Sequence, residues 1–102
     1  MNRPVVWSED ALEDIRHVVQ YLAEVATEYA DKVVERIVDA GMKLGLAQTG
    51  RPGRVFGSYE KSLPEIRYII VYEFDRKQPD GAVSILHVIH SSRAWQPGTW
   101  PE

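Results

Sequence analysis

Residues 66–95 read IRYIIVYEFDRKQPDGAVSILHVIHSSRAW, and this stretch decides the fold. Its two halves, Tyr68–Phe74 and Val83–Ile89, are rich in β-branched and aromatic residues, which favour strands. The polar loop between them contains turn-forming residues, Pro79, Asp80 and Gly81. The pattern therefore predicts an antiparallel hairpin. Polar and cationic groups cluster where its second strand ends, and we expect the functional site there: His87, His90, Ser91, Ser92, Arg93 and Trp95.

Two amphipathic helical patterns precede the hairpin. A short strand is expected over Arg3–Trp7, at a sheet edge because Pro4 lacks an N–H. Ser8 is predicted to cap the first helix and Thr27 the second, which should continue to about Ala47. Apolar residues recur at spacings of three and four, which predicts one buried stripe on each helix. The stripes are Leu12, Ile15, Val19, Leu22 and Ala26, then Tyr29, Val33, Ile37, Ala40 and Leu44. Gly41 and Gly45 indicate close packing of the second helix.

A linker, residues 48–54, leads to a strand over Val55–Leu63, the second strand in the chain, so the predicted order is β-α-α-β-β-β. We expect one α+β domain over residues 1–102, with an irregular tail from about residue 94. Helices that follow each other in the chain should pack as a hairpin on one face of a small antiparallel sheet. The opposite face is then predicted to be uncovered and held for a partner. Its side chains would be those of Arg67, Ile69, Val71 and Glu73.

The composition excludes several classes of protein. The chain has 102 residues, no cysteine and a net charge of −3, which excludes disulfides and cysteine-ligated metals. No apolar run is long enough to cross a membrane, and we expect a cytoplasmic protein without a signal peptide. His87 and His90 are an odd number of residues apart on one strand, so they should face opposite sides and hold no metal together. No cofactor motif is present in the sequence.

The second half of the chain carries cations and aromatics that suit contacts with phosphates, bases or proteins. These residues are Arg51, Arg54, Lys61, Arg67, Arg93, Tyr68, Tyr72 and Trp95. His90 could also act as a general acid or base, or simply bind backbone at a strand end. Composition alone does not separate these alternatives.

Four segments together resemble the RelE/ParE superfamily of toxins from bacterial toxin–antitoxin modules. They read WSEDALEDI (7–15), GRPGR (50–54), RYIIVYEF (67–74) and ILHVIHSSRAW (85–95). The resemblance implies a helical hairpin on an antiparallel sheet, and a cognate antitoxin that wraps and neutralises the toxin in a hetero-oligomer. RelE-like members of the superfamily cleave mRNA on the ribosome, whereas ParE-like members inhibit DNA gyrase and are not nucleases.

Two features favour the ParE-like branch. RelE-like nucleases carry an arginine after the first tyrosine of the strand, where this chain has Ile69, and a net charge of −3 suits a ribosomal RNA site poorly. Candidate contacts with gyrase or the antitoxin are Arg54, Arg67, Ile69, Val71, His90, Arg93 and Trp95. The alternative is a ribosome-dependent endoribonuclease, with His90 as acid or base and Arg54, Lys61 and Arg93 stabilising charge. An inactive relative that only binds a partner is a third interpretation.

Overall fold

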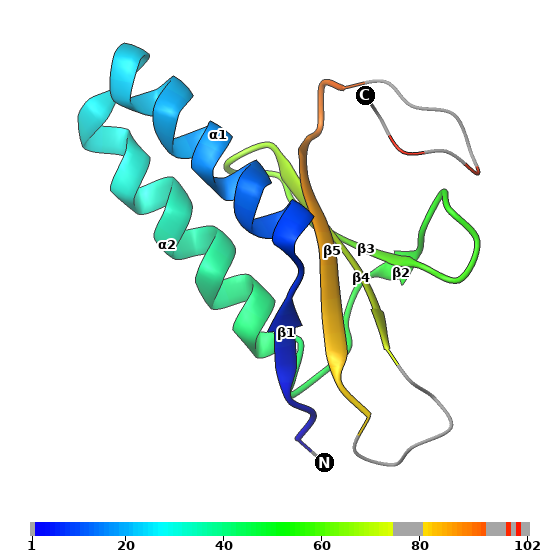
Figure 1. The fold of residues 1–102 in the computed structure, drawn as a ribbon. Helices are drawn as coiled ribbons and strands as arrows, with labels where there is room; N and C mark the ends of the chain where they lie inside the picture. The colour runs from blue at the N-terminus through cyan, green and yellow to red at the C-terminus, as the bar shows by residue number, and fades with distance from the viewer. Residues whose placement is uncertain (1, 75–80, 94–97, 99, 101–102) are drawn as a thin grey trace.

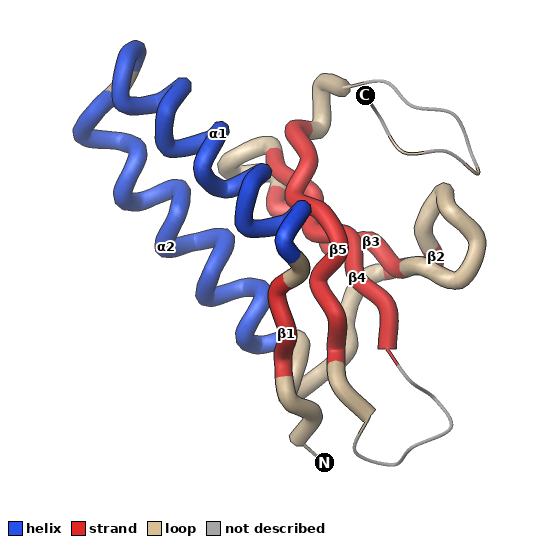
Figure 2. Tube along the Cα trace, in the orientation of Figure 1, coloured by secondary structure: helices blue, strands red, loops and turns tan. Residues whose placement is uncertain are grey.

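The computed structural model describes residues 2–74, 81–93, 98 and 100. Two helices lie side by side on one face of a five-stranded sheet (Figure 1; Figure 2), which confirms the predicted α+β fold with a helical hairpin. The elements are β1 (Val5–Trp7), α1 (Glu9–Val25), α2 (Thr27–Lys43), β2 (Arg51–Pro52), β3 (Tyr59–Leu63), β4 (Tyr68–Phe74) and β5 (Val83–His90). Among the described residues, no helix has the length and apolarity that crossing a bilayer requires.

The sheet is mixed, with the strand order β1-β5-β4-β3-β2. The predicted hairpin is present, because β4 and β5 are antiparallel. β1 instead runs parallel to β5, so the prediction of a wholly antiparallel sheet is wrong at this edge. The backbone N–H of Val83 donates to Pro4 at 2.8 Å, and that of Ser8 donates to Ile85 at 2.9 Å. Two parallel strands must be joined by a long connection. Between β1 and β5 this connection consists of the helical hairpin followed by β2, β3 and β4.

A two-residue strand, β2, lies in the segment that was predicted to be a linker. Its residues Arg51 and Pro52 pair with Glu60 and Tyr59 of β3, so β3 begins four residues later than expected. Gly50 has a φ of 110°, and a Cβ atom there would lie 2.4 Å from the carbonyl oxygen of Glu60. The chain can therefore approach β3 this closely only because residue 50 is glycine.

The two helix starts differ in how they are capped. Ser8 caps α1 as predicted, because its Oγ accepts the backbone N–H of Ala11 at 3.0 Å. Thr27 is not the cap of α2, which Ala26 provides without a side-chain hydrogen bond. Instead the Thr27 hydroxyl donates to the carbonyl of Ala23, in the preceding helix, at 2.7 Å. α2 ends at Lys43, four residues before the predicted end.

The buried side of α1 includes part of the predicted stripe, because Ile15 and Leu22 pack against the core, but it also includes residues outside that stripe. Ala11 and Val18 are buried, whereas Leu12 and Val19 are each 41% exposed. The partner helix follows the prediction closely, since Val33, Ile37, Ala40 and Leu44 are all buried and only Tyr29 of its stripe is exposed. Gly41 also packs closely, as expected, because a Cβ atom there would lie 2.5 Å from the Trp7 ring.

The second face of the sheet is not bare. Ile69, Val71 and Ile89 form a small apolar cluster there, with exposures of 6%, 0% and 4%, and Trp100 packs against it. The prediction of an uncovered face is therefore wrong for Ile69 and Val71, which have no surface to offer a partner. The physical reason is that a tail residue, Trp100, removes these aliphatic side chains from water.

Candidate functional site

The predicted site residues Arg67, His90 and Arg93 lie together at one end of the β4–β5 hairpin. Tyr68, which follows Arg67, pairs with His90 across the two strands. The backbone N–H of Ser91 donates to the carbonyl of Arg67 at 2.7 Å, and that of Arg93 donates to His90 at 3.0 Å. The hairpin register therefore brings the three residues to one place, as the sequence indicated.

Arg67 has an uncommon backbone conformation. Its φ is 63°, in the left-handed region that non-glycine residues rarely adopt, and its N–H donates to Leu63 at 2.9 Å to close the turn between β3 and β4. The Arg67 side chain is exposed, as is that of Arg93. Neither guanidinium has an ion-pair partner among the described residues. Both cations are therefore available to an anionic group of a partner.

The ring of His90 is held by the turn that follows it. Its Nδ1 accepts the backbone N–H of Ser92 at 3.1 Å and lies 2.6 Å from the Ser92 hydroxyl oxygen. The His90 ring also lies nearly perpendicular to the Tyr68 ring, with 5.1 Å between their centroids. Because Nδ1 is an acceptor here, the neutral ring carries its proton on Nε2. The Nε2–H of His90 can therefore donate a hydrogen bond.

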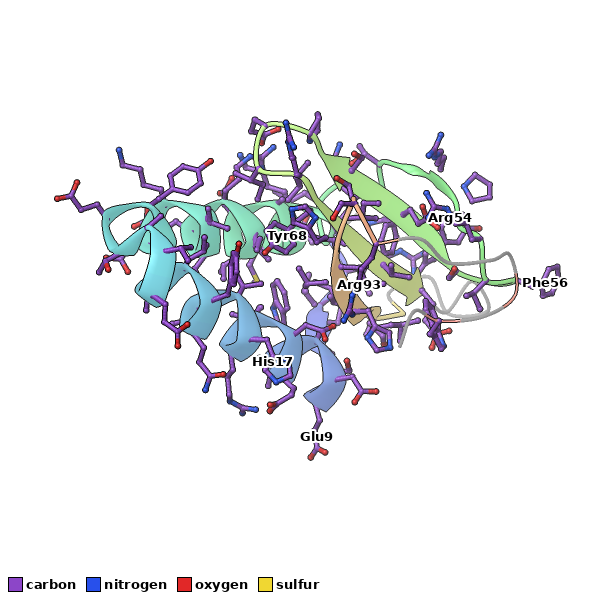
Figure 3. The ribbon with its side chains drawn as sticks, turned by 90° about the horizontal axis from the view of Figure 1, so that it is seen from above. Glu9, His17, Arg54, Phe56, Tyr68 and Arg93 are labelled. Atoms are coloured by element: carbon purple, nitrogen blue, oxygen red, sulfur yellow. The ribbon has the colours of Figure 1, made fainter. Side chains whose placement is uncertain are left out.

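A small cavity of about 150 Å³ lies between this end of the hairpin and α1. His90, Arg93 and Tyr68 line it from the sheet, and Asp14, His17 and Tyr21 line it from α1. Figure 3 shows His17, Tyr68 and Arg93 around the same region. Burial, and then the nearby Tyr21, raise the pKa of Tyr68 above its ordinary value of 10.0, so its hydroxyl stays protonated. The cavity thus offers hydrogen-bond donors to a carboxylate or carbonyl group.

Sequence reasoning missed Asp14 and Tyr21, and treated His17 as a solvated side chain. The side chain of His17 is indeed 66% exposed, although it borders the cavity. The three residues are three and four positions apart, so they share one side of α1. A row of polar and aromatic residues at helical spacing was the signal that could have found them.

Asp14 also fixes α1 to β5. Its Oδ2 accepts the backbone N–H of Val88 at 2.9 Å and lies 3.1 Å from Nδ1 of His87. The ring of His87 packs on Trp100, with 4.9 Å between centroids. His87 thus contacts Trp100 of the second-face cluster, whereas Val88 and His90 line the cavity beside α1. The histidines lie on opposite faces, as the odd spacing predicted.

The other predicted cations lie elsewhere. Lys61 lines a separate cavity of about 420 Å³ beside α2, with Arg36 and Lys43. Arg54 is tied to Glu60, which is 5% exposed: the Arg54 N–H donates to Oε2 at 2.8 Å, and Nε lies 3.9 Å from Oε1. Glu60 and Lys61 are neighbours on one strand and so face opposite sides of the sheet. The endoribonuclease set of Arg54, Lys61, His90 and Arg93 is therefore not assembled in one site.

Trp95 lies outside the described residues. Within the part of the chain that the structure describes, no group of three or more histidine, aspartate or glutamate side chains could hold a metal ion. The candidate site therefore consists of Arg67, Tyr68, His90 and Arg93 on the sheet and Asp14, His17 and Tyr21 on α1.

Comparisons with known proteins agree with this architecture. Residues 5–95 match the family model "ParE toxin of type II toxin-antitoxin system, parDE". A protein of Sinorhizobium fredii, named "Putative toxin Y4kP", is 33% identical over 90 residues, which cover 87% of this chain and 88% of that protein. The chromosomal ParDE system of P. aeruginosa contains a chain of similar fold, with a TM-score of 0.77 and 21% identity over 86% of this chain and 95% of that one. A chain of the toxin-antitoxin complex RelBE2 from Mycobacterium tuberculosis is also similar in fold, with a TM-score of 0.54 and 20% sequence identity. The match covers 88% of this chain and 99% of that one.

Proposed function

Because the chain belongs to the ParE toxin family of type II toxin–antitoxin systems, we propose that it arrests growth in the cytoplasm by inhibiting DNA gyrase. The observation that carries the proposal is the family match, which extends over residues 5–95 and so includes the whole candidate site up to Arg93. Arg67, His90 and Arg93 are the residues we assign to contact with the target, since two exposed cations and a histidine donor converge there. Protein targets are recognised by such clusters of arginine and aromatic groups.

The geometry gives the endoribonuclease alternative no comparable support. Ile69 occupies the position at which RelE-like nucleases carry an arginine, and its side chain is 6% exposed within the second-face cluster. An aliphatic side chain cannot stabilise the negative charge that develops on a phosphate during cleavage. Arg54 and Lys61 lie in separate surroundings from His90.

A cognate antitoxin is the second partner that the family membership suggests. The helical hairpin exposes apolar side chains that suit such a partner, because a groove on α2 is lined by Val34, Val38 and Met42. Val38 and Met42 are 40% and 51% exposed. Glu35 and Asp39 border the same groove, so a helix with an apolar stripe and flanking lysines or arginines would complement it. The proposed complex is a hetero-oligomer of toxin and antitoxin.

Parallel assays of DNA supercoiling and of translation test the proposed target. Purified protein is expected to inhibit supercoiling by gyrase and to leave cell-free translation unaffected. The variant R93A should need at least about tenfold more protein for the same inhibition, because a central arginine contact is lost. Its fold should be retained, since the Arg93 side chain is exposed. R16A is the matched control: Arg16 is an exposed arginine of α1 that pairs with Glu13.

Either of two results would count against this proposal. Inhibition of translation without any effect on supercoiling would favour the endoribonuclease alternative. Full supercoiling inhibition by R93A would remove Arg93 from the contact site, even if gyrase remained the target.

A further inference from the structure

We infer that the loop between β2 and β3, residues 53–58, is a preformed anchor that inserts Phe56 into an apolar socket on a protein partner. Phe56 is 101% exposed, whereas the other exposed large apolar side chains in the described part of the chain range from 40% to 62%. In Figure 3 its ring projects into solvent at one edge of the molecule, beyond Arg54 and Arg93. A phenylalanine with its whole surface in water gains most from burial in a partner, because its contact area is large.

The loop holds Phe56 in a defined turn. The backbone N–H of Ser58 donates to Val55 at 3.0 Å, and Gly57 between them has a φ of 87°. This places Phe56 and Gly57 at the two corners of a type II β-turn, in which glycine supplies the positive φ. The Ser58 hydroxyl donates to the same Val55 carbonyl at 2.6 Å, although Ser58 is only 5% exposed. The buried Ser58 therefore stabilises the turn with two hydrogen bonds to one carbonyl.

A buried carboxylate supports the base of the same loop. Glu60 is 5% exposed and accepts the backbone N–H of Arg54, while Gly53 donates to Ser58 at 2.8 Å. Burying a carboxylate is unfavourable unless it is fully paired, so this support is costly. Joining β2 to β3 would not require it, because a flexible loop would connect the strands equally well. The support instead keeps Phe56 in one position, which reduces the ordering entropy that binding must overcome.

The partner that fits this tip is a protein with an apolar socket and an acidic rim. Val55 adjoins the phenylalanine and is half-buried, and Arg51 is exposed at the base of the loop. Nucleic acid is the weaker alternative, because binding a phosphate backbone requires many cations and the chain has a net charge of −3. Arg54, the nearest other cation in sequence, already pairs with Glu60. The anchor is also distinct from the His90–Arg93 cavity, with which it shares no lining residue.

The test compares F56A with L46A in the full-length protein. Leu46 is another large apolar residue, 62% exposed, and it follows α2. Both variants should keep the parent's circular dichroism and melting temperature. F56A is expected to need at least about tenfold higher expression to arrest growth, whereas L46A should behave as the parent does. Equal potency of F56A and the parent would overturn the inference.

A photo-crosslinking amino acid, p-benzoylphenylalanine, placed at position 56 or at position 46 identifies the class of partner. We expect position 56 alone to form a single protein adduct, which excess parent protein competes away and excess F56A does not. An adduct that nucleases digest, or no adduct at position 56, would overturn the inference. A gyrase subunit in the adduct supports the proposed target as well, whereas a different single protein keeps the anchor and leaves the gyrase proposal to the supercoiling assay.

Discussion

Asp14 joins α1 to an open edge of the sheet, so replacing it should destabilise the fold. β1 pairs with β5 from Val83 to Ile85, and beyond that point no strand of the described part of the chain lies beside β5 on that edge. There the backbone N–H of Val88 finds its acceptor on Asp14, at 2.9 Å. In D14A this donor loses its partner, and Val88 is only 4% exposed, so water replaces the carboxylate poorly. The His87 ring loses the same oxygen.

The expected loss follows from two opposing effects. A buried donor left without an acceptor costs roughly 1–3 kcal/mol. Alanine is a better helix former than aspartate by up to roughly 0.7 kcal/mol, which offsets part of this cost. D14A should therefore lower the free energy of unfolding by about 1–2 kcal/mol, or the melting temperature by roughly 4–16 °C in a domain of this size. D14N keeps a carbonyl oxygen and should lose less than about 1 kcal/mol.

Urea denaturation of D14A, D14N and the neighbouring variant E13A measures these values. Glu13 is the matched control, because it is also a carboxylate of α1 but its side chain is 52% exposed and pairs with the exposed side chains of Arg16 and His17. Such surface pairs contribute about 0–1 kcal/mol. Faster hydrogen exchange at the Val88 amide should accompany the loss in D14A. Equal stability of D14A and E13A, or an unchanged Val88 amide, would refute the assignment.

Two further predictions concern packing and pH. G41A should destabilise the protein by about 1 kcal/mol in thermal unfolding, because crowding of Trp7 and Ile85 costs roughly 1–3 kcal/mol and improved helix propensity returns about 1 kcal/mol; a more stable G41A would show that the ring of Trp7 moves freely. Since the pKa of Tyr68 is raised in the folded state, mainly by burial and then by Tyr21, the unfolded chain releases this proton first, and stability should fall as pH rises above 10. Between pH 8 and 11, the free energy of unfolding should fall less steeply in Y68F than in the parent. Identical slopes would show that Tyr68 is not the source of the pH dependence.

The β4–β5 hairpin could be predicted because its information is local. Tyr68–Phe74 matches β4, and Val83–Ile89 misses only the last residue of β5. Once two strands pair across a turn, residues on either side of it become neighbours, so Arg67, His90 and Arg93 had to meet. The parallel pairing of β1 with β5 could not be predicted in the same way, because the two strands are far apart in sequence. Whether they pair depends on how the two helices and three strands between them pack.

The sequence predicted helix α1 but did not determine which side of that helix faces the sheet. Two adjacent rows of this helix are apolar, one through Leu12 and Val19 and one through Ala11 and Val18. The second row is buried, whereas Leu12 and Val19 of the first row are each 41% exposed. The same uncertainty hid Asp14, which shares the side of α1 that faces β5. A stripe read from sequence thus identifies a helix more reliably than it identifies the residues that the helix presents to a site.

Burial of the second face changes where partners can bind. An exposed aliphatic sheet face would have been the largest surface for another macromolecule, but Trp100 packs over Ile69, Val71 and Ile89. Partner contacts must therefore use surfaces beyond this cluster, and three are available: the groove on α2, the Arg67–Arg93 end and the Phe56 loop. Because these surfaces lie on different elements, a variant in one should leave binding at the others intact. Antitoxin binding and growth arrest should thus be separable by single substitutions, which a protein binding through one sheet face would not allow.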